Sequence, residues 1–291
     1  MIGAIQSTLE RSPSTHGQSL RTAMSERDVV AFIGVFDVFS ATLAARYYDS
    51  LFVSGFSFAA SFYGLPDIGF IAWSDLVSFV QRLRPMLPQH HLLVDIDDGF
   101  GDPEVACHVV SLLESAGASG VVLEDQRRPR RCGHFEGKQL LDIDEYIVKL
   151  KAVLKTRRDM IVVARTDASD VADIHRRMAA MVDAGADAVL VDAIKDLNLL
   201  RSLADEFGLP VAFNQIAGGK SPQADIPTLS RAGASLIIYS TPCLFAAQNA
   251  IDAAMKTLQH SNGLITAAGT GVDVKSCTAI LQQNLQRRNE P

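Results

Sequence analysis

The sequence has few cysteines and no long hydrophobic run, and each absence excludes a class of protein. Its four cysteines are widely spaced and form no C-x-x-C pair, so we expect no disulfide framework and a reducing, cytoplasmic compartment. No apolar run approaches the roughly 20 residues that a membrane-spanning helix needs. The segment from Met1 to His16 lacks the apolar stretch of a secretory signal. We therefore expect no membrane partner.

Positive charge is also scarce. The chain has 27 Lys and Arg against 33 Asp and Glu, a net charge of −6. Nucleic-acid surfaces need clustered Lys and Arg, so no nucleic acid is expected as a partner. What is present is a 48% hydrophobic composition with a mean hydropathy of +0.15, typical of a folded enzyme. The length of 291 residues suits either one large barrel or two ordinary domains.

Short apolar runs alternate with longer segments of helical period from about residue 29 onward. In the longer segments, apolar residues recur at three- and four-residue intervals, as on the buried face of a helix. These predicted helices are Ser74–Arg84, Glu104–Ser115, Ile143–Lys155, Ile174–Asp183, Leu197–Phe207 and Pro242–Gln259. The predicted strands are Val29–Gly34, Leu51–Gly55, Leu92–Ile96, Gly120–Leu123, Ile161–Ala164, Ala188–Val191, Val211–Phe213 and Leu236–Tyr239.

An Ala-Gly-Ala turn followed by an almost wholly apolar strand occurs three times, at Ala116–Ala118, Ala184–Ala186 and Ala232–Ala234. The glycine suits the left-handed end of a helix. A strand without polar residues is buried on both faces, as in a parallel sheet. Eight such β/α units favour an α/β fold of the (β/α)8 TIM barrel type, because closure leaves no sheet edge. The alternative is an open, doubly wound sheet.

We expect the chain to have three parts: a flexible N-terminal tail at residues 1–17, a catalytic barrel at 18–260, and a linker with a C-terminal helix at 261–291. The linker stretch Asn262–Gly271 is rich in Gly and Thr. The predicted last helix, Cys277–Arg288, has helical period but few apolar residues, so it needs support from the barrel or from another subunit. A homo-oligomer, either a dimer or a tetramer, is therefore a reasonable hypothesis.

Functional residues of a β/α barrel follow the carboxyl ends of its strands, and here those positions are strongly acidic. Asp95 and Asp97 end the third predicted strand, Glu124 the fourth, and Asp192 follows the sixth. On an extended strand, Asp95 and Asp97 would share one face. Oxygen donors without a His or Cys pair favour Mg²⁺ or Mn²⁺ over zinc. The alternative is that these are ordinary solvated loop acids that cap the following helices.

The loop after the fourth strand, Gln126–Lys138, is unusually polar. Cys132 follows Arg130 and Arg131, and cationic neighbours lower the pKa of a thiol, so we expect a thiolate there. The loop also holds two glycines, which would let it close over a ligand as a lid. The alternative is a solvated basic loop with an incidental cysteine.

Two further segments complete the predicted rim. Asn214 precedes a glycine-rich loop that ends at Ser221, and its amide and hydroxyl groups suit a carboxylate or phosphate. Ser54 and Gly55 follow the second strand, and the loop around Phe56 is expected to select substrate size.

In combination, these motifs resemble the isocitrate lyase / phosphoenolpyruvate mutase superfamily across about residues 20–259. The resemblance rests, in order, on Ser54-Gly55, Gly64–Asp67, Val94–Gly101, Glu124–Gln126, Arg131–His134, Ala164–Ala168 and Asn214. The pattern is most similar to the short members, of the 2-methylisocitrate lyase, dimethylmalate lyase and oxaloacetate-cleaving type. It implies a barrel whose eighth helix is swapped between subunits, usually in dimers of dimers.

The resemblance also implies a role for each site residue. Asp95 would bind Mg²⁺ directly, and Asp67, Asp97 and Glu124 would act through its waters. Cys132 would protonate an enolate, beside His134 and Arg130. Substrate would be bound at its 2-oxo-acid end by Ser54, Gly55 and Arg165, at its distal carboxylate by Asn214 and Ser221, and further by Phe56, Gly133 and Asp192.

The implied function is a Mg²⁺-dependent carbon–carbon lyase that acts on a small 2-hydroxy or 2-oxo di- or tricarboxylate through an enolate intermediate. Two residues depart from the lyase pattern. Arg130 stands where the lyases have lysine, and arginine does not readily exchange a proton. Asp192 stands where they tend to have glutamate. Rival functions are decarboxylation or hydrolysis of oxaloacetate, P–C chemistry of the mutase or phosphonopyruvate type, and a non-catalytic barrel that binds a metabolite.

Overall fold

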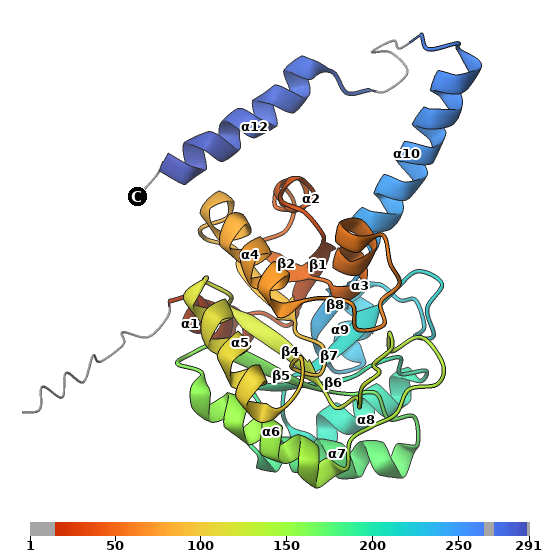
Figure 1. Cartoon of the computed structure of the whole chain (residues 1–291). Coiled ribbons are helices and arrows are strands. Elements are labelled where there is room, and N and C mark those ends of the chain that lie inside the picture. Colours follow the sequence, from red (N-terminus) through yellow and green to blue (C-terminus); the bar gives the residue numbers. More distant parts are fainter. Residues whose placement is uncertain (1–14, 265–270, 290–291) are drawn as a thin grey trace, which may run out of the picture.

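Eight parallel strands form a closed barrel in the computed structural model, which describes residues 15–264 and 271–289 (Figure 1). Neighbouring strands are consecutive in sequence, and β8 pairs with β1, with Val30 opposite Leu236. The closed sheet confirms the predicted TIM barrel and excludes the open sheet. The strands are β1 (Val30–Val35), β2 (Ser50–Val53), β3 (His91–Asp95), β4 (Gly120–Glu124), β5 (Ile161–Thr166), β6 (Ala188–Val191), β7 (Val211–Gln215) and β8 (Ala234–Tyr239).

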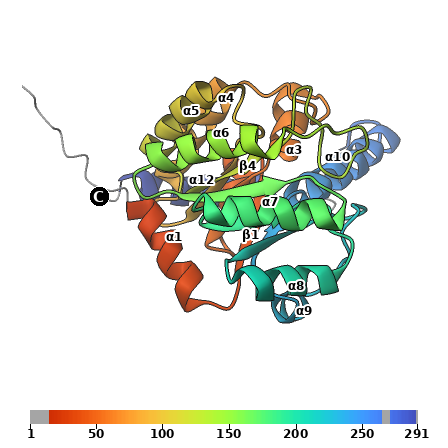
Figure 2. The same cartoon turned by 90° about the horizontal axis from the view of Figure 1, so that it is seen from below.

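Helices surround the barrel, as the view from below shows (Figure 2). The long ones match the predicted segments: α4 (Trp73–Leu83), α5 (Pro103–Ser115), α6 (Ile143–Thr156), α7 (Val171–Asp183), α8 (Leu197–Phe207) and α10 (Pro242–His260). The sequence pattern missed the short ones, because they span too few residues to show a period. These are α2 (Val38–Ala44), α3 (Gly55–Phe58), the π-helix η1 (Ala59–Tyr63), the 3-10 helix η2 (Arg84–Met86) and α9 (Ile226–Arg231).

Helix α1 (Thr15–Glu26) was not predicted, and it packs against the interior of the barrel. Leu20 and Ala23 are buried in one cluster with inward-facing strand residues such as Phe32 and Val163. The last residues of the expected N-terminal tail are therefore helical. Residues 1–14 lie outside the described part of the chain.

The three Ala-Gly-Ala turns adopt the predicted left-handed conformation. Gly117, Gly185 and Gly233 have φ angles of 93°, 91° and 94°. A side chain at this φ is strained, so glycine is the residue that ends each helix and leads into the next strand.

Glu114, in the last turn of α5, is bound by the segment that leads into β5. Its buried carboxylate accepts hydrogen bonds of 2.9 Å from the backbone N–H groups of Arg158, Asp159 and Met160. Burial alone would raise the pKa of Glu114, but these hydrogen bonds outweigh it and lower the pKa. The carboxylate thus joins two adjacent β/α units.

The substitution Glu114→Gln is expected to lower the free energy of unfolding at pH 7 by about 3 kcal/mol, because an amide cannot accept all of these bonds. A group with a lowered folded-state pKa stabilises above its unfolded pKa of about 4.3 and loses this effect as pH falls through the folded value. The difference between variant and wild type should therefore shrink in acid. Urea unfolding at pH 7 and below pH 4 measures it, and an equal difference at both values would contradict the assignment.

Helix α10 extends away from the barrel, and α12 (Val274–Asn289) runs back over it (Figure 1). All of α10 is described, and none of its residues is buried. Asn284 of α12 donates a hydrogen bond to the Thr42 hydroxyl at 3.2 Å, so the last helix packs on the barrel of its own chain. Residues 265–270 of the expected linker lie outside the described residues. Within residues 15–264 and 271–289, no helix has both the length and the apolar character to cross a membrane.

Candidate active site

Polar side chains at the carboxyl ends of the strands continue the inward-facing side of the barrel. The barrel interior is lined by Leu93, Val122, Val163, Leu190 and Ala212, among others. Side chains alternate between the two faces of a strand, so the residue two positions later points the same way. Those residues are Asp95, Glu124, Arg165, Asp192 and Asn214, and all five are buried. The predicted convergence at one end of the barrel is confirmed.

Asp95 and Asp97 meet beside Gly55, but not for the predicted reason. Strand β3 ends at Asp95, and Asp97 has a left-handed φ of 50°, so the two do not share the face of an extended strand. A Cβ atom at Gly55 would lie 2.9 Å from Asp95 Oδ2 and 3.3 Å from Asp97 Oδ1. The missing side chain of Gly55 therefore leaves room for both carboxylates.

The guanidinium of Arg130 lies among the carboxylates. Its Nε donates to Glu124 Oε1 at 2.7 Å, and Nη1 lies 3.2 Å from Asp97 Oδ1. Nη1 also donates to Asp67 Oδ1. Arg130 is only 1% exposed, although it belongs to a loop. The contacts hold the middle of that loop against the ends of β3 and β4.

The carboxylate cluster, Asp67, Asp95, Asp97 and Glu124, has the donor chemistry of a divalent-cation site. Burial raises the pKa of Asp95, and it raises the pKa of Asp97 to about 8. Among the described residues, both carboxylate oxygens of Asp97 and Oε2 of Glu124 are buried without a hydrogen-bond partner. Such oxygens suit a hard cation such as Mg²⁺.

The four carboxylates of the cluster do not surround one common point, as the ligands of a metal ion do. Within residues 15–264 and 271–289, no three His, Cys, Asp or Glu side chains are placed to hold a metal ion. Arg130 contacts Asp67, Asp97 and Glu124 from a position between them, so their carboxylates do not meet at a shared metal position. The donor chemistry fits the ion, and the metal-binding roles of the four residues stay a prediction.

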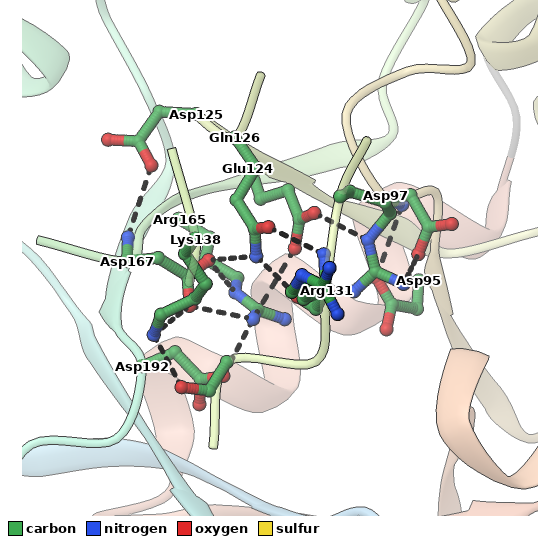
Figure 3. Close-up of polar contacts among 12 residues, drawn as sticks. Asp95, Asp97, Glu124, Asp125, Gln126, Arg131, Lys138, Arg165, Asp167 and Asp192 are labelled. Atoms are coloured by element: carbon green, nitrogen blue, oxygen red, sulfur yellow. Dashed lines mark hydrogen bonds and ion pairs between the residues drawn. The ribbon is translucent and has the colours of Figure 1, made fainter. Parts of the chain in front are cut away.

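Arg165 joins the carboxylate cluster to a second acidic group (Figure 3). Its Nη2 lies 3.3 Å from Glu124 Oε2, 3.1 Å from Asp167 Oδ1 and 2.7 Å from Asp192 Oδ2. Burial alone would raise the pKa of Asp192, but Arg165, His134 and Asn214 outweigh it and hold that pKa well below its usual range. Asp192 is therefore a carboxylate at neutral pH.

Three residues to which the sequence analysis gave no role, Gln126, Lys138 and Asp167, hold the loop in place (Figure 3). Gln126 bonds the backbone of Arg131 through both ends of its amide, at 2.7 and 2.9 Å, and donates to Asp167 Oδ2 at 3.1 Å. Lys138 Nζ donates to Asp167 Oδ1 at 3.2 Å and to the carbonyl of Gly133. Asp167 directly follows β5, and that position was the signal that could have found it.

Cys132 is a buried thiol, and the predicted thiolate is wrong. Burial, together with the carboxylates of Asp67 and Asp192, raises its pKa to about 12. Its sequence neighbour Arg130 points its charge at the carboxylate cluster instead. The backbone N–H of Cys132 donates to the carbonyl of Asp67 at 3.0 Å. The sulfur therefore keeps its proton at neutral pH.

Gly133 and His134 lie against the Arg165–Asp192 pair. A Cβ atom at Gly133 would collide with Asp192 Oδ2 and lie 2.6 Å from Arg165 Nη2, so only glycine fits there. His134 Nδ1 accepts the backbone N–H of Lys220 at 2.9 Å. This places its Nε2 towards Asp192, 3.6 Å from Oδ1.

The remaining predicted residues have more local contacts. The Ser54 hydroxyl accepts the N–H of Ser57 at 3.2 Å and begins α3, which is why the second strand is shorter than predicted. The Phe56 ring packs edge-on against another aromatic ring, Phe245 of α10. Asn214 donates to Asp192 Oδ1 at 2.9 Å. Ser221 has a buried hydroxyl without a hydrogen-bond partner among the described residues.

This arrangement combines a buried arginine, a protonated thiol and a set of carboxylates within one end of the barrel. Arg165 can bind a carboxylate or an oxyanion, and preorganised charge of this kind is a large catalytic contribution. A neutral thiol can donate a proton to carbon or oxygen.

Comparison with known proteins gives consistent similarities. A family model described as phosphoenolpyruvate phosphomutase matches residues 20–259. The 2-methylisocitrate lyase of Bacillus subtilis is 34% identical over 238 residues, 80% of this chain and 78% of that protein. The crystal structure of a 2,3-dimethylmalate lyase superposes with a TM-score of 0.87 at 26% identity, covering 95% of this chain and 94% of that one. An oxaloacetate acetylhydrolase bound to 3,3-difluorooxalacetate gives a TM-score of 0.88 at 26% identity, covering 96% and 98%.

Proposed function

Because the chain belongs to the phosphoenolpyruvate phosphomutase family, within the isocitrate lyase / phosphoenolpyruvate mutase superfamily, we propose that it is a Mg²⁺- or Mn²⁺-dependent carbon–carbon lyase. The substrate is a small 2-hydroxy di- or tricarboxylate similar to 2-methylisocitrate. The names of its relatives support this class, since they include 2-methylisocitrate lyases and a 2,3-dimethylmalate lyase.

Asp95, with Asp67, Asp97 and Glu124 around it, would hold a divalent ion, whose positive charge would stabilise a developing oxyanion. Arg165 binds the carboxylate next to the hydroxyl-bearing carbon and adds a second positive charge. The hydroxyl proton leaves to a base, the carbon–carbon bond breaks, and its electron pair passes to the carboxylate fragment as an enolate. Arg130 is not that base, because its neighbours raise its pKa further above an already high value.

Cys132 donates its thiol proton to the enolate carbon and completes the carboxylate product. This step carries the proposal, since the observation behind it is a buried, protonated Cys132 in a loop that also covers Arg165. A thiolate could not act as the acid. Asn214 and Ser221 bind the distal carboxylate, and Ser54, Gly55, Phe56, Gly133 and Asp192 shape the remaining substrate site.

A turnover panel tests the function. Isocitrate, 2-methylisocitrate, dimethylmalate, citramalate, oxaloacetate and phosphonopyruvate are incubated with the protein and Mg²⁺, then with EDTA, and followed by proton and phosphorus NMR. We expect one hydroxy acid to give a 2-oxo acid or glyoxylate with Mg²⁺ and no product with EDTA. If the folded, metal-bound protein turns over none of them, the lyase proposal fails for these substrates and the metabolite-binding alternative gains support.

A second candidate is hydrolysis or decarboxylation of oxaloacetate. It is favoured by the residue at position 130: arginine does not readily exchange a proton, and this chemistry needs the metal and Arg165 but no lysine base. Oxalate with acetate, or pyruvate with carbon dioxide, would identify it in the same panel. Phosphate release from phosphonopyruvate would instead identify P–C chemistry.

We also propose that the protein is a homo-oligomer in which α10 packs on another subunit. The exposed α10 carries apolar residues, with Ile251 61% and Met255 56% exposed. Burial of such a face against a second copy removes apolar surface from water.

A further inference from the structure

The feature that the proposed reaction leaves unexplained is the position of Arg130. Its guanidinium contacts Asp67, Asp97 and Glu124, three of the four residues to which the metal is assigned. An arginine in a loop is ordinarily exposed, yet this one is 1% exposed. The chain itself thus places a positive charge where the ion is expected.

The guanidinium and a divalent ion cannot both bind the same carboxylate oxygens at the same time. Mg²⁺ binds carboxylate oxygens at about 2.0–2.1 Å in near-octahedral geometry. Arg130 holds Glu124 Oε1 and Asp97 Oδ1 at 2.7 and 3.2 Å and separates them from Asp67. Two cations at the same oxygens also repel strongly in a buried site, where the effective dielectric constant is low.

Arg130 does not fully satisfy the cluster. Both oxygens of Asp97 and Oε2 of Glu124 are buried without a hydrogen-bond partner in the part of the chain that the structure describes, and Asp97 Oδ1 and Glu124 Oε2 have only ion-pair contacts, with Arg130 and Arg165. Two positive charges face four carboxylates: Arg130 contacts Asp67, Asp97 and Glu124, and Arg165 contacts Glu124 and acts on Asp95 through its charge. A divalent ion therefore has an electrostatic advantage over the single charge of Arg130.

We propose that Arg130 is a resident cation that the divalent ion displaces, and that its displacement releases the middle of the loop that carries Cys132. This inference rests on the proposed metal-dependent function and adds a coupling between metal loading and the position of the thiol loop.

The loop is fastened in a way that permits such movement. The two ends of the loop are held without Arg130, because the backbone N–H of Arg127 donates to the carbonyl of Gln139 at 2.7 Å and Lys138 donates to Asp167. Gly137, with a φ of 81°, provides a hinge next to the second anchor. Between the anchors, the Arg130 contacts and the Cys132–Asp67 backbone bond face the cluster. Gln126 also holds the backbone of Arg131, so loss of the Arg130 contacts loosens the loop on the side of the carboxylate cluster and leaves the Gln126 bonds in place.

The substitution Arg130→Met tests the competition, because it keeps a long side chain and removes the charge. The matched control is Arg128→Met. Arg128 belongs to the same loop and makes a two-bond pair with Asp98, which is not in the carboxylate cluster. Mn²⁺ binding is measured by EPR and by the metal-induced rise in melting temperature. We expect Mn²⁺ to bind R130M at least tenfold more tightly than wild type, and to bind R128M within twofold of wild type.

Equal or weaker Mn²⁺ binding by folded R130M would overturn the inference, since Arg130 would then assist the ion or be indifferent to it. If R130M does not fold, hydrogen–deuterium exchange of the wild-type protein decides. Peptides covering residues 127–135 are expected to exchange faster with saturating Mn²⁺ than with EDTA, and unchanged or slower exchange would contradict displacement.

The same data separate this inference from the function on which it rests. A wild-type protein that binds Mn²⁺ and turns over substrate, with R130M binding no more tightly, removes the inference alone. Absence of Mn²⁺ binding in both proteins removes the metal-dependent function and the inference with it.

Discussion

Replacing Cys132 with serine is expected to lower kcat for carbon–carbon cleavage by about 100- to 10,000-fold, the usual contribution of a general acid. A hydroxyl is a much weaker acid than a thiol, so the enolate would be protonated by water, and this proton transfer is slower. KM should change little, because the proton moves only in the transition state. The thiol is buried and protonated, so serine fits the space and removes mainly the acidity.

Steady-state kinetics on the substrate identified by the panel measure this effect. Cys107→Ser serves as the control, since Cys107 is a half-buried cysteine on α5 and has no part in the reaction. Full turnover by folded C132S would show that another group donates the proton.

The second large effect is expected for Arg165→Lys, with kcat/KM lower by about 100- to 1,000-fold, the cost of removing one oxyanion donor. Lysine keeps the charge but has no planar fork, so it cannot form the two-bond pair that Arg165 makes with Asp167 through Nε and Nη2 while Nη2 also contacts Glu124 and Asp192. The substitution would weaken the contact with the oxyanion, and it would also move the acidic groups from their positions.

Arg177→Lys is a matched control for Arg165→Lys. Arg177 is also a buried arginine, and its partners are Asp125, which follows β4, and Asp173, one turn earlier on its own helix α7. We expect R177K to melt at a lower temperature while its folded fraction keeps its kcat/KM. An equal loss of kcat/KM in both variants would indicate that Arg165 has a general structural role.

The barrel could be predicted from the sequence because its signals are local. Apolar strands, helical periods and the Ala-Gly-Ala turns each occupy a short continuous segment, and the structure places them where predicted. Helix α1 was missed because its apolar residues are few, and its partners, such as Phe32, lie on the inner face of the strands. A packing partner that is distant in sequence leaves no mark on the local pattern.

The candidate site could be predicted only as a set of positions. Counting in steps of two from the inward-facing apolar residues gives Asp95, Glu124, Arg165, Asp192 and Asn214 directly. The charge state of Cys132 could not be found in this way. Its pKa depends on burial and on which way the Arg130 side chain turns, and side-chain direction in an irregular loop has no sequence period.

The most direct test of the central claim is cleavage of the best substrate of the panel in D₂O, followed by proton NMR with Mg²⁺ and with EDTA. We expect a 2-oxo acid such as glyoxylate, together with a carboxylate product that carries one deuterium at the carbon released by bond cleavage. Both products should require the metal, and C132S should form them far more slowly. A folded, Mg²⁺-bound protein that yields no such product from any substrate, or cleavage that EDTA leaves unchanged, would contradict it.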